Sequence, residues 1–453
     1  MAISVSGCKK LIDINPPVNE TPSAAIFASD RTSLGALSGM YGYFTSAVAQ
    51  NTDLVVNSSL MADDLRYLGL VVAPTEYNNN TYLVNTASTE AFSSWYALIY
   101  RANAIIQGMQ GVGGTSEAVR TRLTAEAKII RAYSYFNLVN LYGAVPLVIS
   151  TDANVTAFLP RETPENVYRQ MITDLSDAKA SLPADYSATS GSRTGVNRFT
   201  ASALLARVYM FTGDYAAAES NASEVIASSL YSITPSATMR TALFVNNSAE
   251  SIWQLPPYLS ATTYYTAEGA QFIPASATSA VNYTMQPGLL QIFQANDLRR
   301  TGWMSTRVVS GTTYTIPFKY KYRDNATATA AGVTENQIIL RLAEQYLIRA
   351  EARARVGSNT AGALSDLNVI RVRAGLAAST TTAATILLDE IALENRREFF
   401  CEQGFRWNNL RRTGQADAVL GALKPTYRPQ AKLYPFAQSI INVNTNLVQN
   451  PGY

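Results

Sequence analysis

Helical periodicity is the feature that most restricts how this chain can fold. Over eight segments, apolar residues recur every three to four positions, which gives a helix one apolar face. The predicted helices cover residues 91–109, 116–142, 164–182, 201–211, 216–228, 337–356, 361–374 and 387–404. Glycines that suit a left-handed helix end follow several of them, at Gly143, Gly213, Gly357, Gly375 and Gly404. A predominantly α-helical fold is therefore expected.

Two of the predicted helix pairs share one spacing of small and apolar residues. Ala206 precedes Gly213 by seven residues, and Ala350 precedes Gly357 by seven; a Val-Ile pair follows each glycine after twelve residues. The small residue lets two helices approach closely, and the glycine lets the chain reverse. This spacing predicts tetratricopeptide-like helix pairs, with long insertions where a regular solenoid would continue.

The longest interruption of the helical pattern covers residues 231–332. It is rich in Ser, Thr, Ala, Pro and aromatic residues, and residues 308–322 within it predict a small β-hairpin. A second irregular stretch covers residues 65–86. Long loops on a helical scaffold are typical of functional surfaces. We expect residues 21–453 to form a single domain, with the loop-rich insertion at 231–332 as its ligand face.

The chain contains no histidine, and this excludes several kinds of chemistry. Without an imidazole it cannot build a Ser-His-Asp or Cys-His nucleophile, or an HExxH zinc site. The 36 Lys and Arg residues against 33 Asp and Glu give a net charge of +3, which offers no footprint for nucleic acid. No nucleotide-binding glycine motif, EF-hand loop or cysteine cluster occurs, so no cofactor or metal is predicted.

Cys8 carries the sequence signal for attachment to a membrane. An apolar residue and two small residues precede it, as in the lipobox of bacterial lipoproteins, whose cysteine is acylated. A signal peptide also needs a basic region and roughly 7–15 apolar residues. Only residues 1–5 precede the box, so either the chain starts late or the match is fortuitous. Residues 1–20 are expected to be a signal remnant and tether, lipidated at Cys8.

Short motifs spread along the whole chain resemble those of one protein family. They are WYALIYRAN (95–103), EAKIIRAY (126–133), LYGAVPL (141–147), RETPENVY (161–168), NDLR (296–299), RLAE (341–344), RAEA (349–352), NVIRVRAG (368–375), GFRW (404–407) and NLVQNPGY (446–453). In this order they resemble the SusD/RagB family, the cell-surface nutrient-binding lipoproteins of Gram-negative glycan-uptake systems. The resemblance spans about residues 8–453 and also favours lipidation of Cys8.

The resemblance implies a SusD-like fold and a function without catalysis. The chain would capture oligosaccharides on the outer face of the outer membrane and deliver them to a SusC-like TonB-dependent barrel. Two positions depart from the family pattern. Asn395 stands where the family usually has Arg, and Asn409 where it usually has Asp. The charges embedded in apolar helices are predicted to form partly buried structural ion pairs: Glu126 with Arg131, Glu344 with Arg349, and Glu394 with Arg397.

Sugar recognition needs flat aromatic faces for the apolar side of the rings, and amides and guanidinium groups for the hydroxyls. Both irregular regions concentrate such side chains. The candidate ligand-binding residues are Trp303, Tyr264, Tyr265, Tyr283, Tyr67, Tyr77, Asn79, Tyr82, Arg66 and Asp64. Trp303, a rare residue type in a polar stretch, is the strongest single candidate.

Asp63 and Asp64 are the acidic pair that a glycan hydrolase would require. Adjacent helical residues point about 100° apart, which does not suit two carboxyl groups on either side of one bond. In a structural interpretation, Asp63 or Asp64 caps a helix or bonds a loop backbone. In a functional interpretation, one of the two lies at the rim of the ligand groove. Two alternatives to a glycan-binding protein remain: a peptide-binding member of the same family, and a carboxylate-dependent hydrolase.

Overall fold

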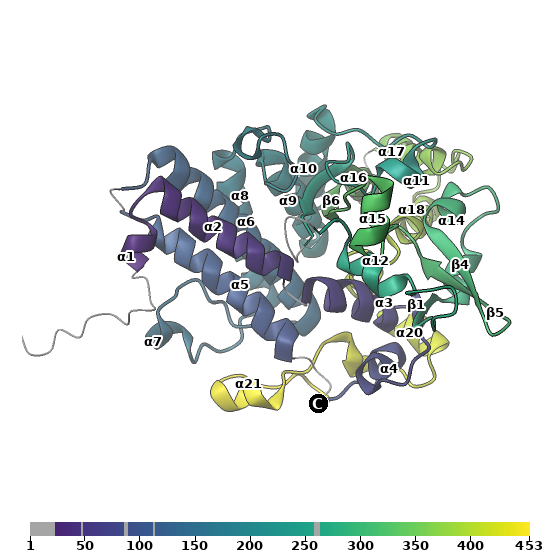
Figure 1. Cartoon of the computed structure of the whole chain (residues 1–453), viewed down its shortest axis with the longest axis horizontal. Coiled ribbons are helices and arrows are strands. Elements are labelled where there is room, and N and C mark those ends of the chain that lie inside the picture. Colours follow the sequence, from purple (N-terminus) through teal and green to yellow (C-terminus); the bar gives the residue numbers. More distant parts are fainter. Residues whose placement is uncertain (1–22, 47–48, 86–88, 112–113, 258–262, 358) are drawn as a thin grey trace, which may run out of the picture.

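The computed structural model describes residues 23–453 apart from 47–48, 86–88, 112–113, 258–262 and 358. Cys8 and the tether predicted at residues 1–20 lie outside the described residues, so both stay predictions. Figure 1 shows a mainly helical molecule with short strands gathered on one side, as the periodicity predicts. No helix in the described ranges is both long and apolar enough to span a membrane.

The first half of the chain is almost entirely helical, and its long helices lie side by side on the left of Figure 1. Its elements are α1 (Ser23–Ile26), α2 (Asp30–Ser46), the π-helix η1 (Ala49–Asn57), α3 (Ser58–Met61), β1 (Leu65–Tyr67), α4 (Val72–Asn79), α5 (Thr89–Gly108), α6 (Glu117–Tyr142), α7 (Ala153–Thr156), α8 (Pro164–Ser181), the 3-10 helix η2 (Ser187–Thr189), α9 (Arg198–Thr212) and α10 (Tyr215–Ala227). The start of α8 is the predicted one: Pro164 occupies its first turn and the Thr163 hydroxyl accepts from the Asn166 amide at 3.3 Å.

The insertion carries the strands and several short helices. Its elements are α11 (Met239–Ala242), β2 (Ser251–Leu255), α12 (Ala267–Phe272), β3 (Tyr283–Met285), α13 (Pro287–Gln291), α14 (Leu298–Gly302), β4 (Met304–Val309), β5 (Thr312–Pro317) and α15 (Asn325–Ala331). Strand β4 pairs with β5 in the hairpin that the sequence predicts. Strand β3 pairs with β1, which joins the two irregular regions into one surface.

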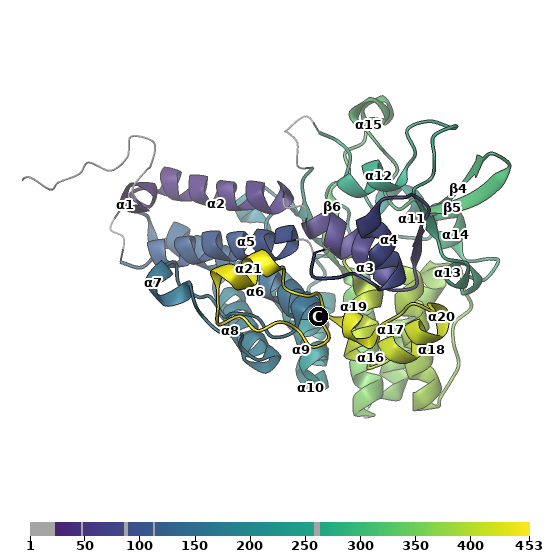
Figure 2. The same cartoon turned by 90° about the horizontal axis from the view of Figure 1, so that it is seen from below.

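The last third returns to helices. Its elements are β6 (Gln337–Arg341), α16 (Leu342–Val356), α17 (Thr360–Arg373), α18 (Ala384–Phe399), α19 (Phe405–Arg412), α20 (Ala416–Leu423), the 3-10 helix η3 (Pro429–Lys432) and α21 (Gln438–Val443). Seen from below in Figure 2, α16–α18 lie on one side of α3 and α4, and the insertion lies on the other.

The tetratricopeptide-like pairs are confirmed. Gly213 ends α9 with φ of 81° and Gly357 ends α16 with φ of 76°, both in the left-handed region that lets the chain reverse. Ala206 of α9, Ala218 of α10 and Ala352 of α16 are buried in one cluster. The small side chains therefore allow the two helix pairs to pack closely against each other.

Two predicted helix boundaries are wrong. Residues 337–341 form strand β6 antiparallel to β2, and the helix begins only at Leu342. The helix predicted over 387–404 ends at Phe399, and α19 begins at Phe405. Cys401 and Gln403 between them have positive φ, which an α-helix does not accommodate. Cys401 is buried.

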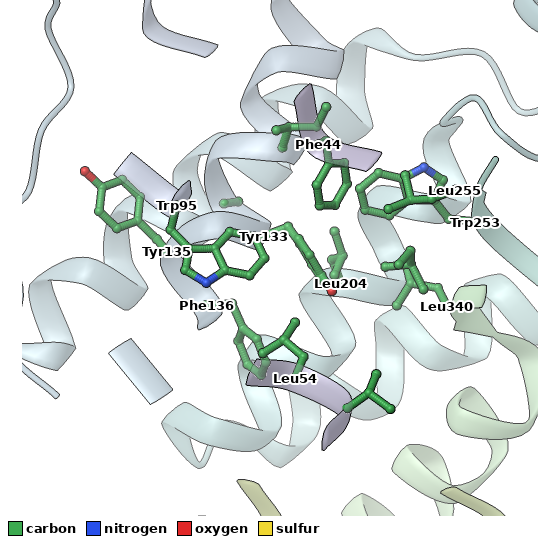
Figure 3. Packing of buried hydrophobic residues seen from close by; sticks show 14 of the residues in the cluster. Phe44, Leu54, Trp95, Tyr133, Tyr135, Phe136, Leu204, Trp253, Leu255 and Leu340 are labelled. Carbon is green, nitrogen blue, oxygen red and sulfur yellow. The ribbon is translucent and has the colours of Figure 1, made fainter. Parts of the chain in front are cut away.

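The core joins the helical half to the insertion through aromatic rings (Figure 3). Phe44 of α2, Tyr133 of α6 and Trp253 of β2 lie with ring centroids 5.6 Å apart in each pair, and Trp95 of α5 lies 5.9 Å from Tyr133. All four are almost completely buried. Their edge and tilted contacts are favourable for aromatic packing and hold β2, and with it the insertion, against α2 and α6.

Candidate ligand-binding face

A row of three aromatic rings crosses the β1–β3 ladder and ends at the surface. Tyr67 lies opposite Tyr283 in the register, with ring centroids 5.3 Å apart, and Tyr283 lies 6.0 Å from Phe272 at the end of α12. Tyr283 and Phe272 are each 7% exposed, whereas Tyr67 is half-buried. Tyr67 is therefore the ring of this row that a ligand can reach.

The chain around Tyr67 fixes the position of its ring. The Tyr67 amide donates to the side-chain oxygen of Asn78 at 3.1 Å, and its hydroxyl oxygen accepts from the Val71 amide at 3.3 Å. A Cβ atom at Gly69 would lie 2.2 Å from that hydroxyl, so only glycine lets the loop pass so close to the ring. An aromatic side chain held in this way is preorganised to stack on a flat apolar surface.

An exposed apolar loop that the sequence analysis did not single out borders Tyr67. Leu70 is 98% exposed, and Val71 and Val72 are also largely exposed. Three exposed apolar side chains in a row are unusual on a protein surface and mark a contact region. The signal was present in the sequence as an apolar run inside an otherwise polar loop, after Gly69.

Four of the other candidates remain accessible, but the structure does not bring them all together. Arg66 is exposed and lies opposite Thr284 in the β1–β3 ladder. Asn79 is half-buried at the end of α4, and its side-chain oxygen accepts from Asn78 at 2.9 Å. Tyr264 and Tyr265 are half-buried just before α12. The backbone of Tyr264 binds Asn325 and Glu335, which ties this segment to α15 rather than to β1.

Trp303 is not a surface residue, and this corrects the strongest candidate. Its side chain is 0% exposed and lies at the junction of α14 and β4. The Phe244 ring packs edge-on against it at 5.5 Å, and the Lys319 amino group lies 4.9 Å from its ring centroid. A ring covered on these sides cannot stack on a sugar, so Trp303 is a core residue.

Tyr77, Tyr82 and Tyr283 are corrected in the same way. Tyr77 and Tyr82 are 3% and 0% exposed and pack with Tyr434, each ring centroid lying 5.5 Å from that of Tyr434. The Tyr82 hydroxyl donates to the Ala431 carbonyl. These tyrosines attach the C-terminal segment to α4, and Tyr283 supports Tyr67 from beneath.

Asp63 and Asp64 are buried in ion pairs and do not face a groove. The Asp63 carboxylate binds Arg406 at 2.7 Å and Arg396 at 2.8 Å, and Asp64 binds Arg396 at 3.2 Å. Burial raises the pKa of Asp64, and the negative charge of Asp63 adds to this while Arg396 opposes it. For Asp63 the two arginines outweigh burial and lower the pKa. Asp64 at the rim of a ligand groove is therefore wrong.

The buried charges of the helices are paired, but two of the three predicted partnerships are wrong. Glu394 binds Arg397 at 3.4 Å as predicted, whereas Glu126 and Glu344 bind other residues than Arg131 and Arg349. Glu126 binds Arg122 and the Tyr41 hydroxyl, both at 2.7 Å. Glu344 of α16 binds Arg207 of α9 at 2.6 Å. Such pairs fix how the helices lie against one another. The described residues contain no group of three or more Cys, Asp or Glu side chains placed to hold a metal ion.

These features define a helical scaffold that carries a loop-built aromatic face. Two family models match the chain: one described as "SusD family" over residues 293–453, and one described as "Starch-binding associating with outer membrane" over residues 44–210. "SusD-like protein P2" of Formosa agariphila is 26% identical over 100% of this chain and 98% of its own length. "Starch-binding protein SusD" of Bacteroides thetaiotaomicron is 36% identical over 25% of this chain and 21% of its own.

Solved structures of the same superfamily share the fold. A SusD homolog from Bacteroides thetaiotaomicron superposes with a TM-score of 0.81 at 18% identity, covering 95% of this chain and 98% of the other. A laminarin-binding SusD-like protein superposes with a TM-score of 0.78 at 22% identity, covering 94% of this chain and 100% of the other. The chain belongs to the SusD/RagB family, as its motifs indicate.

Proposed function

We propose that this chain is a cell-surface binding protein that captures oligosaccharides. The observation that carries the proposal is Tyr67, a half-exposed ring held by its own loop and supported from beneath by Tyr283. A preorganised aromatic face of this kind suits the apolar side of a pyranose ring. Membership of a family whose described members include starch-binding and laminarin-binding proteins supports the same ligand class.

Binding at this face needs no bond to break. Tyr67 stacks on one sugar ring, while Arg66, exposed beside it, donates to hydroxyl groups. Tyr264 and Tyr265, just before α12, and Asn79, at the end of α4, are further ligand contacts in the proposal. The exposed loop from Leu70 to Val72 borders the bound chain.

The proposed partner is a SusC-like TonB-dependent barrel, to which the bound glycan is handed over. A lipid on Cys8 holds the protein at the outer face of the outer membrane. The family model described as "Starch-binding associating with outer membrane" supports this location. The lipid and the barrel are tested together by asking whether the full-length chain co-purifies with a barrel from outer membranes, and whether Cys8→Ser releases it from the membrane.

The rival functions are a peptide-binding member of the family and a hydrolase using Asp63 or Asp64. The ion pairs of both carboxylates with Arg396 and Arg406 disfavour the hydrolase, because a general acid or nucleophile must reach the glycosidic bond. Release of reducing ends from a polysaccharide, lost in Asp64→Asn, would favour it. Saturable peptide binding with no response to sugars would favour the other rival.

Calorimetric titration of the chain that begins after Cys8, against plant, microbial and host oligosaccharides, tests the proposal. Each ligand found is titrated again with Tyr67→Ala and with Tyr264→Ala. Removing a stacking ring is expected to weaken binding roughly 5- to 30-fold, the cost of about 1–2 kcal/mol of aromatic contact. The matched control is Tyr100→Ala, since Tyr100 is an exposed tyrosine on α5.

Three results are informative. Loss of affinity in Tyr67→Ala but not in Tyr100→Ala supports both the function and the face. Glycan binding that survives every tyrosine substitution keeps the function and rejects this face. Absence of binding across the panel, by a chain whose circular dichroism shows it to be folded, rejects glycan capture by the chain alone.

A further inference from the structure

A cleft outside the aromatic face lies between the β4–β5 hairpin and helices α13 and α14. Its volume is about 420 Å3, within the range of about 300–1,000 Å3 that small-ligand sites occupy. Leu290 and Met304 supply apolar surface, and Arg300 supplies the charge. The remaining lining residues all carry hydroxyl groups: Thr301, Ser305, Thr306 and Thr315. No carboxylate lines it, so the cleft is cationic and rich in hydroxyls.

Arg300 has a charge that the fold does not use. Its neighbour Arg299 is fully buried and binds Asp297, Glu394 and Glu398 at 2.7–3.0 Å. The guanidinium group of Arg300 is exposed and makes no hydrogen bond or ion pair to any residue that the structure describes. Of two consecutive arginines, one therefore holds the fold together and the other is free to bind a ligand.

Three of the four hydroxyl residues around Arg300 lie on the regular β4–β5 hairpin, and Thr301 lies on α14. Thr306 and Thr315 lie directly opposite each other in the β4–β5 register, so their side chains project from the same face. The Thr315 carbonyl accepts from the Thr284 hydroxyl at 2.9 Å, and Thr284 is the partner of Arg66 across the β1–β3 ladder. This hydrogen bond links β5, which lines the cleft, to β3, the neighbour of the strand that carries Arg66 and Tyr67.

We infer that this cleft binds an anionic unit of the glycan, with Arg300 contacting a carboxylate or sulfate group and the surrounding hydroxyls contacting the ring. The inference rests on the proposed glycan-binding function and adds the substrate class. Guanidinium groups bind planar carboxylates and sulfates through paired charge-assisted hydrogen bonds. The near-neutral net charge is a sum over the whole chain and does not describe a local surface. The lining of this cleft carries positive charge from Arg300 and no negative charge.

An array of matched glycans tests the inference. Each neutral backbone is printed beside its uronate form and its sulfate ester, which separates the two sources of negative charge. The chain beginning after Cys8 is applied as wild type, as Arg300→Gln and as Arg31→Gln. Arg31 is an exposed arginine on α2, at the opposite end of the molecule from the β4–β5 hairpin (Figures 1 and 2).

Wild type is expected to prefer one anionic form over its neutral backbone, and to lose that preference as salt rises, because exposed charges are screened. Arg300→Gln should weaken binding of the anionic form about 10- to 100-fold, the usual effect of losing a hydrogen bond to a charged group. Arg31→Gln should bind like wild type.

Different results overturn the inference and the proposed function. Preference for neutral glycans, or anionic binding that Arg300→Gln leaves unchanged, overturns the cleft while glycan capture stands. Failure of the folded wild type to bind any glycan on the array overturns the proposed function, and the inference falls with it.

Discussion

Glu268 shows how strongly burial changes one side chain in this molecule. It lies on α12, is 5% exposed and accepts from the Gln337 amide at 2.9 Å. Burial raises its pKa from 4.5 to about 8; the Gln337 hydrogen bond opposes this, and the charge of Glu402 adds to it. The folded state therefore holds a proton that the unfolded chain has already released at neutral pH.

Glu268→Gln should make the protein more stable than wild type at alkaline pH. The stabilising contribution of protonated Glu268 is fully present below pH 4.5 and is lost as pH rises through about 8. The variant cannot ionise and keeps the acceptor for Gln337, so its advantage in unfolding free energy should grow over this range, by up to roughly 5 kcal/mol. Urea unfolding at pH 5, 6.5 and 8.5 measures it.

The matched control for Glu268→Gln is Asp389→Asn, at an exposed position on α18. A surface change of this kind should alter the unfolding free energy by less than about 0.5 kcal/mol. If the difference between Glu268→Gln and wild type is the same at pH 5 and pH 8.5, the carboxyl of Glu268 is not protonated in the folded protein.

Which tyrosine or tryptophan reaches the surface could not be predicted from the sequence. The two irregular regions lie beside each other in the fold, because β1 pairs with β3. Trp303 and Tyr67 each stand within three positions of an arginine along the chain, so the local sequence does not distinguish them. Only the fold shows that Arg299, which precedes Trp303, is itself buried, and that Tyr67 beside Tyr283 is only half-buried. Exposure depends on neighbours distant in sequence, which a local pattern does not contain.

At the scale of helices and turns, left-handed glycines control the helix pairs. Gly213→Ala should lower the unfolding free energy by about 1–2 kcal/mol, because alanine is strained at a φ of 81°. Gly39→Ala is the opposite case, since Gly39 lies inside α2 with nothing within 4 Å of an added Cβ. It should stabilise by about 0.5–1 kcal/mol. Thermal unfolding of both variants measures the contrast, and equal effects would contradict the role of Gly213 as a turn.

The two departures from the family pattern contact each other where α18 meets α19. The Asn409 amide donates to the Asn395 side-chain oxygen at 2.8 Å. The Arg and Asp that the family resemblance implies for these positions would lie at the same junction, where they could form an ion pair in place of the two amides. A single exchange should therefore behave differently from a double one.

A double-mutant cycle with Asn395→Arg and Asn409→Asp tests this replacement. The coupling energy should be favourable by about 1 kcal/mol, since residues in contact are not additive. The single change Asn395→Arg should be the worst of the three variants, because Arg412 already binds the Asn409 side chain at 3.1 Å and repels a second cation. Additive unfolding free energies would show that the two positions do not interact.

Most helices could be predicted from periodicity and caps, but strand β6 could not. Ile338, Ile339 and Leu340 are all buried, and a continuous apolar run fits either a buried helix or a buried strand. The pairing of β6 with β2, some 85 residues earlier, decides between them, and no local signal reports such a contact. The end of α18 at Phe399 was missed for a similar reason, because Cys401 and Gln403 are rarely found at positive φ.

At the scale of the whole molecule, one carboxylate links the insertion to the helix pairs. Glu398 of α18 is 0% exposed and pairs with Arg299 of α14, Arg341 of β6 and Arg373 of α17. Burial alone would raise its pKa, but the charges of Arg373, Arg341 and Arg299 outweigh it and hold the pKa well below its usual range. The insertion and the last helices should therefore unfold together.

Glu398→Gln should destabilise both parts at once, by about 3–5 kcal/mol, because it leaves buried arginines without their shared counter-charge. The stability that ionised Glu398 provides is present above its unfolded pKa of about 4.5 and is lost as pH falls below it, so wild type should also weaken in acid. Asp417→Asn is the control: Asp417 binds Lys432 on the surface, and losing an exposed pair should cost less than about 1 kcal/mol. Urea unfolding followed by both circular dichroism and tryptophan fluorescence should give one shifted transition. Two separate transitions in Glu398→Gln, against one in wild type, would show that this network alone couples the insertion to the scaffold. A single transition at the same urea concentration as in wild type would show that the core around Trp253 already couples them.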